Sequence, residues 1–327
     1  MNENKIILSI IIPEYNGYKT IMKCLNSIYE QKVSEQLFEV VCVDDGSTDG
    51  KSAAYIEKEF IAKTNHFNFK FIKSPENRGI GGARNVALLH ASGEWVMYLD
   101  CDDYLLLGNL LKLIQFLSEN VDVDLVPFDF NRIDMTLCNG HLSKNKMPGK
   151  EFLNTQSIPW NATCYAYRKS FLEKNDIHFV EKVYFEDVDY VMKSIFNSAF
   201  VKYAPIPVYF YVLYPVQTSK IATNYKKAED AFGLSMRLRK VASEIKPKDE
   251  ESYNTVIRHH YYMYLHNLYF IWVFSFSQIL GLLRKYPAEK SKNMPFLVAF
   301  SLNFPGLFAF TLTLFKPLLF LLRKIKG

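Results

Sequence analysis

The residues best suited to chemistry are acids that lie directly after predicted strands. Asp100, Asp102 and Asp103 follow the apolar run at 95–99. In open parallel sheets, ligands bind beyond the carboxyl ends of the strands. Neighbouring carboxylates repel one another unless a cation lies between them, and oxygen ligands of this kind suit Mg²⁺ or Mn²⁺. The cluster therefore predicts a divalent metal site, with a capped, solvated turn as the alternative.

A second acidic segment, residues 44–49, follows the apolar run at 38–43. A carboxylate at this place can accept a hydrogen bond from a nucleobase N–H. Ser47, Thr48 or Asp49 can equally cap the helix that comes next. The segment predicts either one edge of a base-binding pocket or a helix cap alone.

A glycine-rich segment, residues 77–85, enters a predicted helix. Gly79 and Gly81 occupy the first two glycine positions of a GxGxxG pattern, which lets a phosphate approach the backbone at a helix N-terminus. Arg84 stands at the third glycine position, and this strand–helix unit is the third of the chain rather than the first. The sequence therefore disfavours a Rossmann-type dehydrogenase.

The last acidic pair, Glu186 and Asp187, begins a predicted helix over 186–196. Acids in a first helical turn complement the helix dipole and need no further function. The alternative is a general base aimed at a substrate hydroxyl. Position along the chain does not separate these two interpretations.

Alternating strands and helices must position these segments. Apolar β-branched runs predict strands, and apolar residues at i, i+3, i+4 and i+7 predict a helix over 21–28. Repeated strand–helix units imply an α/β fold, a mostly parallel sheet with helices on both faces. In the first hundred residues, strands are predicted at 6–12, 38–43, 67–72 and 95–99, and further helices at 52–62 and 83–91. Beyond them, helices are predicted at 105–117, 186–196 and 226–283, and strands at 123–130, 160–167 and 201–213, with residues 131–158 rich in loops.

Composition excludes several classes of protein. The 327 residues allow one large domain or about two ordinary ones. A content of 49% hydrophobic and 22% charged residues excludes a disordered chain. The five cysteines are scattered, without CxxC or CxxH spacing, which argues against a disulfide framework or zinc site and favours a reducing compartment. A net charge of +5 is too small to indicate a nucleic-acid partner, and the apolar run at 6–12 is too short for a secretion signal.

The C-terminal segment is basic and apolar. Residues 284–327 contain eight Lys or Arg and one acid, so the rest of the chain carries a net charge of −2. Residues 296–315 contain no charge and are long enough to span a bilayer, but Asn303–Gly306 interrupts this run. The pattern predicts a pair of short helices lying on a membrane surface with Lys and Arg against anionic lipid. A true span, and a soluble helical cap or oligomer face, are the alternatives.

Five segments in one order resemble the family 2 glycosyltransferases of the GT-A fold, of the bacterial surface-polysaccharide type. They are Ser9–Asn16, Val43–Asp49, Asn77–Asn85, Leu99–Asp103 and Glu186–Asp187. Five motifs in order are far more specific than any one of them, and the resemblance covers about residues 6–220.

The resemblance also implies a domain organisation. A GT-A glycosyltransferase domain, a Rossmann-like sheet with flanking helices, would cover residues 1–225. Its nucleotide-binding half would be about 1–105 and its acceptor half about 106–225. Residues 226–327 would form a helical C-terminal region, with a membrane-associating, amphipathic tail at about 284–327.

The resemblance assigns the nucleotide-binding residues by matching motif positions. Pro13 and Tyr15 would line the base pocket, and Asp45 would hold the edge of the base. Asn77 and Arg84 would be loop partners of the base and the nucleotide.

The same matching assigns the metal and the catalytic base. Asp100 would bind on the ribose side, Asp102 would be the main metal ligand, and Asp103 would lie near the ion. Asp187 matches the catalytic base, with Glu186 as its supporting neighbour. Trp160 and Tyr167-Arg168 resemble the acceptor-half segment that precedes the base.

The sequence departs from the family pattern at two places. Glu14 stands where a small or apolar residue is more usual. Val212 stands where the family often has Arg, so the phosphate contact from that loop is in doubt; Ser219 resembles the Ser that follows, and Lys220 could replace the contact.

The implied reaction is a metal-assisted single displacement that inverts the anomeric carbon. Asp187 would take the proton of an acceptor hydroxyl, and Arg84 and the helix start at Gly81-Gly82 would help to neutralise the departing diphosphate. The donor would be a nucleotide-diphosphate sugar, most commonly of uridine, and the acceptor a glycan or lipid-linked hydroxyl. The enzyme would lie in the cytoplasm against the inner face of the cell membrane, with its oligomeric state open. A nucleotidyltransferase and a non-catalytic sugar-nucleotide binding module are the alternatives.

Overall fold

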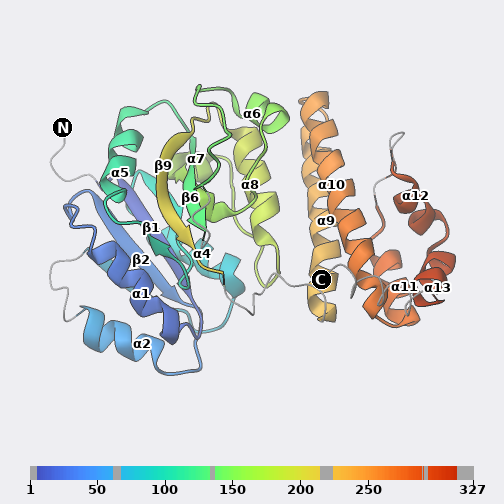
Figure 1. The fold of residues 1–327 in the computed structure, drawn as a ribbon, viewed down its shortest axis with the longest axis horizontal. Helices are drawn as coiled ribbons and strands as arrows, with labels where there is room; N and C mark the ends of the chain where they lie inside the picture. The colour runs from blue at the N-terminus through green and yellow to red at the C-terminus, as the bar shows by residue number, and fades with distance from the viewer. Residues whose placement is uncertain are drawn as a thin grey trace. The chain divides into compact units, whose positions relative to one another are not determined.

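The computed structural model describes residues 6–61, 68–132, 137–213, 224–288, 290 and 294–314. The chain divides into two compact units, residues 1–214 and 215–327. The first unit contains the sheet, and the described part of the second consists of helices and their connections (Figure 1).

Four parallel strands form the first half of the sheet. Strand β1 (Leu8–Glu14) lies between β2 (Phe38–Asp44) and β4 (Trp95–Tyr98), and β3 (Phe69–Lys73) pairs with β2. All residues of β1, β2 and β4 are buried, as expected for strands covered on both faces. Because the strands are parallel, their carboxyl ends share one edge of the sheet, where the acidic segments follow.

Helices cover both faces of this half. Helix α1 (Tyr18–Tyr29) buries the predicted apolar stripe, Ile21, Cys24, Leu25 and Ile28. Helix α2 (Ser52–Tyr55) continues as a π-helical stretch over Ile56–Phe60. Helix α4 (Gly79–His90) contacts β1 and β2 and begins four residues before its predicted start, so the glycine-rich segment lies inside the helix.

The second half of the sheet is mixed. Strand β8 (Tyr165–Arg168) runs antiparallel between β4 and β6 (Leu125–Arg132). Strand β9 (Ala204–Tyr211) is parallel to β6 and antiparallel to the short β5 (Tyr104–Leu105), and β7 (Leu137–Cys138) pairs with β6. The complete order is β3-β2-β1-β4-β8-β6-β9-β5.

Two predicted elements beyond residue 100 differ in the structure. The helix predicted over 105–117 is α5, Leu110–Glu119, because Leu105 pairs with β9 and Gly108 adopts a left-handed conformation (φ +79°) that ends the extended segment. The loop-rich segment 131–158 contains helix α6 (Gly149–Thr155). A 3₁₀ turn (Ala162–Cys164) precedes β8, and helices α7 (Lys169–Lys174) and α8 (Glu186–Asn197) follow it.

The second unit begins with two long helices, α9 (Tyr225–Ile245) and α10 (Glu250–Phe270), which pack side by side (Figure 1). A 3₁₀ turn (Ile271–Val273) and the helices α11 (Phe276–Lys285), α12 (Phe296–Asn303) and α13 (Pro305–Leu314) follow. Within the described ranges, no single helix has the length and apolar character to cross a membrane. Helices α12 and α13 have the required length and apolar character only when taken together, and this pair is bent by 111°.

Candidate functional site

The acidic cluster after β4 brings three carboxyl groups together. One oxygen from each of Asp100, Asp102 and Asp103 lies within 4.8 Å of the others. Loss of surrounding water and the neighbouring charge of Asp100 raise the pKa of Asp102 to about 6 and that of Asp103 to about 8. Hard oxygen donors that repel one another in this way fit a divalent cation such as Mg²⁺ or Mn²⁺.

Strand β9 holds Asp103 in place. The Tyr209 hydroxyl donates a hydrogen bond to Oδ2 of Asp103, and the Val212 N–H donates to Oδ1 over 2.8 Å. The same hydroxyl accepts the N–H of Asp100 over 3.3 Å. Sequence reasoning gave Tyr209 no part in the site, because its strand lies more than a hundred residues from the acidic cluster.

Arg84 links the acidic cluster to the start of α8. Its Nη2 lies 2.8 Å from Asp100 Oδ1, and its Nη1 lies 3.0 Å from Glu186 Oε1 and 2.6 Å from Asp187 Oδ1. The Arg84 side chain is 1% exposed. Such a buried cation is stable only because the three carboxylates compensate its charge.

This arrangement differs from the role expected for Arg84. The sequence predicted a partner of the base and nucleotide, whereas the structure directs both Nη atoms to protein carboxylates. Arg84 therefore positions acids of two separate segments in this structure. A contact with the nucleotide remains a prediction.

The glycines that precede Arg84 have a packing role. Gly81 and Gly82 are buried, and a Cβ atom at Gly81 would lie 2.7 Å from the carbonyl oxygen of Val180. The segment at 179–181 covers this side of α4, and the helix begins at Gly79; a contribution of Gly81-Gly82 to diphosphate binding stays a prediction. Sequence alone did not reveal that segment as a neighbour.

The acidic pair lies at the beginning of α8. Phe185, which precedes it, has a left-handed backbone (φ +62°), a conformation that is rare for bulky residues and concentrates at functional sites. Burial raises the pKa of both Glu186 and Asp187, and the Arg84 guanidinium opposes this rise. The side chain of Asp187 is 22% exposed and that of Glu186 9%, so Asp187 is the more accessible acid.

Asp45 anchors the residues that lead into α4. Its carboxyl group is buried at the end of β2, and its Oδ1 accepts the N–H of Arg78 over 2.8 Å. Burial raises the pKa of Asp45. Asn77 is exposed, and its Oδ1 accepts the N–H of Gly79 over 3.1 Å. Asp45 and Asn77 are therefore neighbours at the start of α4, as expected for two residues of one binding site.

Glu14 explains one departure from the family pattern. It is buried, with Oε1 accepting the Gly17 N–H over 2.6 Å and Oε2 accepting the Ser47 hydroxyl over 3.0 Å. The Asn16 side chain accepts the N–H groups of Thr48 and Asp49. These bonds join the loops after β1 and β2.

Pro13 is buried near the end of β1. The side chain of Tyr15, directly after this strand, is 49% exposed. Of the predicted capping residues, Asp49 accepts the N–H and hydroxyl of Ser52, the first residue of α2, whereas the cap position itself is Lys51.

Other predicted positions have packing contacts of their own or lie outside the described residues. Tyr167 is buried and donates its hydroxyl to the Ala162 carbonyl over 3.1 Å, and Arg168 pairs with Glu94, so both have structural roles. Ser219 and Lys220 lie outside the described residues.

Sequence comparisons find known proteins that are similar to this chain. The sequence profile of the family described as Glycosyl transferase family 2 matches residues 9–179. The poly(ribitol-phosphate) beta-N-acetylglucosaminyltransferase TarS of Staphylococcus aureus is 32% identical over 250 residues, which cover 74% of this chain and 41% of TarS. The chain thus spans about two fifths of the length of this relative.

Solved structures are similar in fold. The crystal structure of S. aureus TarS 1–349 in complex with UDP-GlcNAc has a TM-score of 0.59 at 22% identity, over 86% of this chain and 82% of that one. The mannosyltransferase PcManGT from Pyrobaculum calidifontis, in complex with GDP-Man and Mn²⁺, has a TM-score of 0.57 at 19% identity, over 95% and 87%. At these identities the likeness concerns the fold.

Proposed function

The chain belongs to glycosyl transferase family 2, and on this premise we propose that it is an inverting transferase that moves a sugar from a UDP-sugar to a hydroxyl of a glycan or lipid-linked acceptor. A phosphate-containing acceptor, a chain of polyol phosphates, is favoured because the similar TarS is named a poly(ribitol-phosphate) transferase. The observation that carries the proposal is the link through Arg84, which ties Asp100 of the acidic cluster to Asp187. Family membership favours a glycosyltransferase over the nucleotidyltransferase and the binding module considered from the sequence.

The donor nucleotide would lie at the carboxyl ends of β1, β2 and β4. The exposed ring of Tyr15 is available to stack on a base beside Pro13, and Asp45 and Asn77 would border the same base pocket. Asp100 would contact the ribose. A UDP-sugar is favoured because the similar TarS structure was determined with UDP-GlcNAc.

Asp102, with Asp100, would hold Mg²⁺ or Mn²⁺. Asp103 lies within ligand distance of the pair, but both of its oxygens already accept hydrogen bonds from β9 and the residue after it, so it would mainly orient the cluster. The ion, when bound, would neutralise charge on the departing diphosphate. The similar PcManGT structure contains Mn²⁺.

Asp187 would act as the general base. It would accept the proton of the acceptor hydroxyl while that oxygen bonds to the anomeric carbon and the bond from this carbon to the diphosphate breaks. A single displacement of this kind inverts the configuration at the carbon. Arg84 would hold the Asp187 carboxylate in position and Glu186 would complete its surroundings.

The apolar surface of α12 and α13 supports attachment to the inner face of the cell membrane. Six large apolar side chains on this helix pair and its connection are more than half exposed: Phe296, Leu297, Phe304, Leu307, Phe310 and Leu314. Exposed apolar side chains gathered on two short helices suit the interface of a bilayer.

Calorimetric titration tests the donor site directly. UDP, GDP, dTDP and NAD are titrated into the protein with Mn²⁺ and again with EDTA. Metal-dependent binding of UDP without binding of NAD is the expected result. Binding of NAD, or of no nucleotide under either condition, would contradict the proposed donor site; preference for GDP or dTDP would keep the reaction and change the donor.

A further inference from the structure

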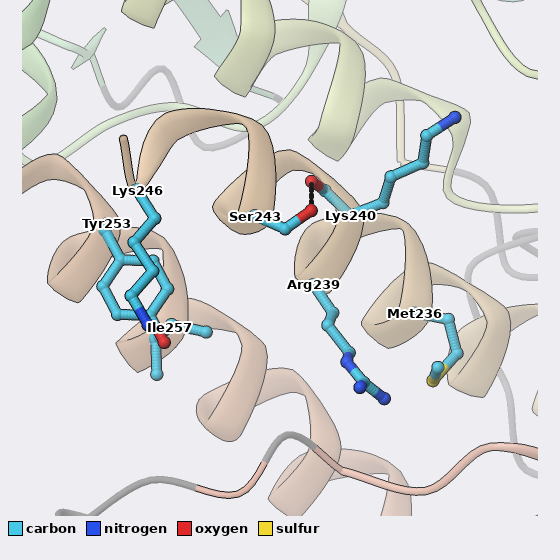
Figure 2. A pocket seen from close by; sticks show the side chains of 7 residues that line it. All are labelled: Met236, Arg239, Lys240, Ser243, Lys246, Tyr253 and Ile257. Carbon is cyan, nitrogen blue, oxygen red and sulfur yellow. Dashed lines mark hydrogen bonds between the residues drawn. The ribbon is translucent and has the colours of Figure 1, made fainter. Parts of the chain in front are cut away.

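A cavity of about 450 Å³ lies between α9 and α10, wholly within the second unit (Figure 2). This volume falls within the range of about 300–1,000 Å³ that is usual for small-ligand sites. No acid lines it. The lining consists of Met236, Arg239, Lys240, Ser243, Lys246, Tyr253 and Ile257.

The charge in this cavity comes from one face of α9. Arg239, Ser243 and Lys246 are spaced i, i+4 and i+7, which places them along the same side of the helix. Figure 2 shows the Arg239 and Lys246 side chains extending to that side, whereas Lys240 extends away from it. Two of the three cations in the lining, Arg239 of α9 and Lys246 directly after it, therefore face the cavity.

The opposite wall is apolar and aromatic. The Lys246 Nζ lies 5.1 Å from the centroid of the Tyr253 ring, and Ile257 is buried behind it. In the part of the chain that the structure describes, Lys246 makes no ion pair. An anionic group with a carbon chain attached suits this combination, because the cations attract the charge and the ring and aliphatic side chains contact the carbons.

We propose that the α9–α10 cavity binds a phosphate group of the acceptor, a chain of polyols joined by phosphodiesters, at a point separate from the reacting hydroxyl. The acceptor class rests on the proposed function. Each phosphodiester in such a chain carries one negative charge, which Arg239 and Lys246 can bind together.

A second contact on the same polymer has a measurable consequence. Binding at one point raises the local concentration of the polymer at the other, so affinity grows with chain length. A substitution in the cavity should raise KM for long acceptors while leaving kcat, and the KM of a single polyol phosphate, unchanged.

Fluorescence anisotropy of a labelled ribitol-phosphate oligomer, titrated with the full chain, tests the proposal. We expect Arg239→Gln/Lys246→Gln to weaken binding by at least about tenfold, since charge-assisted hydrogen bonds are lost. Lys246→Gln alone should weaken it several-fold. Lys227→Gln is the matched control, with the same charge change on the same helix but outside the cavity lining, and should bind as the unaltered protein does.

Three results would overturn the proposal. The first is unchanged oligomer binding by the double variant, and the second is an equal loss in Lys227→Gln. The third is that Arg239 and Lys246 are needed for binding to phosphatidylglycerol vesicles while the oligomer does not bind. Titration of UDP into each variant separates this proposal from the proposed function. If the unaltered protein does not bind UDP, the proposed donor site is contradicted. If the variants bind UDP normally but bind the oligomer less tightly, the effect belongs to the cavity alone.

Discussion

Arg84 illustrates how one buried side chain can organise a site through the acids that it pairs with. It is buried, and it compensates the charges of an acid after β4 and two acids at the start of α8. Fixed charges that are already in place need no reorganisation during a reaction, which is the usual source of electrostatic catalysis. At the residue scale, we therefore expect substitutions here to change the chemistry more than the binding of a nucleotide.

Asp187→Asn should lower kcat by about 10²–10⁴-fold, because an amide cannot accept the proton of the acceptor hydroxyl. UDP affinity should stay within about twofold, since Asp187 lies at α8 rather than in the loops that border the base pocket. Transfer is followed with a UDP-release assay and binding by calorimetry. Asp176→Asn, an exposed acid of the same unit, is the control. Normal turnover by Asp187→Asn would remove this residue from the role of base.

The pH dependence of kcat/KM should show the effect of burial on Asp187. A base must be deprotonated, so activity falls as the pH drops through its pKa. Burial raises the pKa of Asp187, so this fall should occur above the value of about 3.9 usual for aspartate.

Arg84→Met should move the fall to still higher pH, because Arg84 lowers the pKa of Asp187. Arg84→Lys keeps the positive charge and should leave the profile near that of the unaltered protein. A profile that Arg84→Met does not move would show that the titrating group lies elsewhere.

At the scale of elements, close packing decides where α4 and α8 can place their side chains. Helix α4 carries Arg84 and lies against the segment at 179–181, which leads into α8. The absence of side chains at Gly81 and Gly82 permits this approach. The position of α4 therefore sets the distance between Arg84 and the acids that it pairs with.

Gly81→Ala should destabilise the protein by about 1–3 kcal/mol, since the added Cβ would lie 2.7 Å from the Val180 carbonyl oxygen. Gly233→Ala, inside α9, is the matched control. The nearest atom to its added Cβ would be Nη1 of Arg237, at 3.8 Å, and replacing a helical glycine should stabilise the protein by up to about 1 kcal/mol. Urea unfolding followed by circular dichroism measures both. Equal midpoints for the two variants would argue against close packing at Gly81.

Leu307→Ser/Phe310→Ser should reduce co-sedimentation with anionic vesicles by at least about tenfold, because both exposed apolar side chains would leave the bilayer interface. Leu89→Ser/Leu107→Ser removes two exposed leucines of the first unit and serves as the control. The same loss in both double variants, or no loss in either, would contradict attachment through α12 and α13.

At the scale of the whole molecule, the two units divide the proposed tasks. All predicted nucleotide, metal and catalytic residues belong to the first unit, and the basic cavity and the exposed apolar helices belong to the second. Such a division allows the second unit to vary in length and partners while the chemistry stays in the first.

A shortened chain of residues 1–224, which ends before α9, should bind UDP in the presence of Mn²⁺ within about threefold of the full chain. The reason is that the loops after β1, β2 and β4 are anchored by bonds inside the first unit, such as those of Glu14 and Asp45. Calorimetry with both chains is the measurement. A folded short chain without UDP affinity would mean that the second unit contributes to the donor site.

The sequence by itself determined many of the elements, and the motifs. Strands β1, β2 and β4 were predictable because their residues are apolar on both faces, and α1 because its apolar stripe repeats at helical spacing. The acids at 100–103 and 186–187 were predictable because they follow a strand or begin a helix. Such signals depend on neighbours a few residues apart, which a single sequence displays.

Only the tertiary structure decided which of these residues contact one another. Arg84 meets Glu186 and Asp187 across 102 and 103 residues of chain, and Tyr209 meets Asp103 across 106. Glu14 could be identified only as a departure from a pattern until its bonds to Gly17 and Ser47 were known. Charge pairs and close contacts over such separations depend on the order of the strands and the packing of the helices, which local periodicity does not encode.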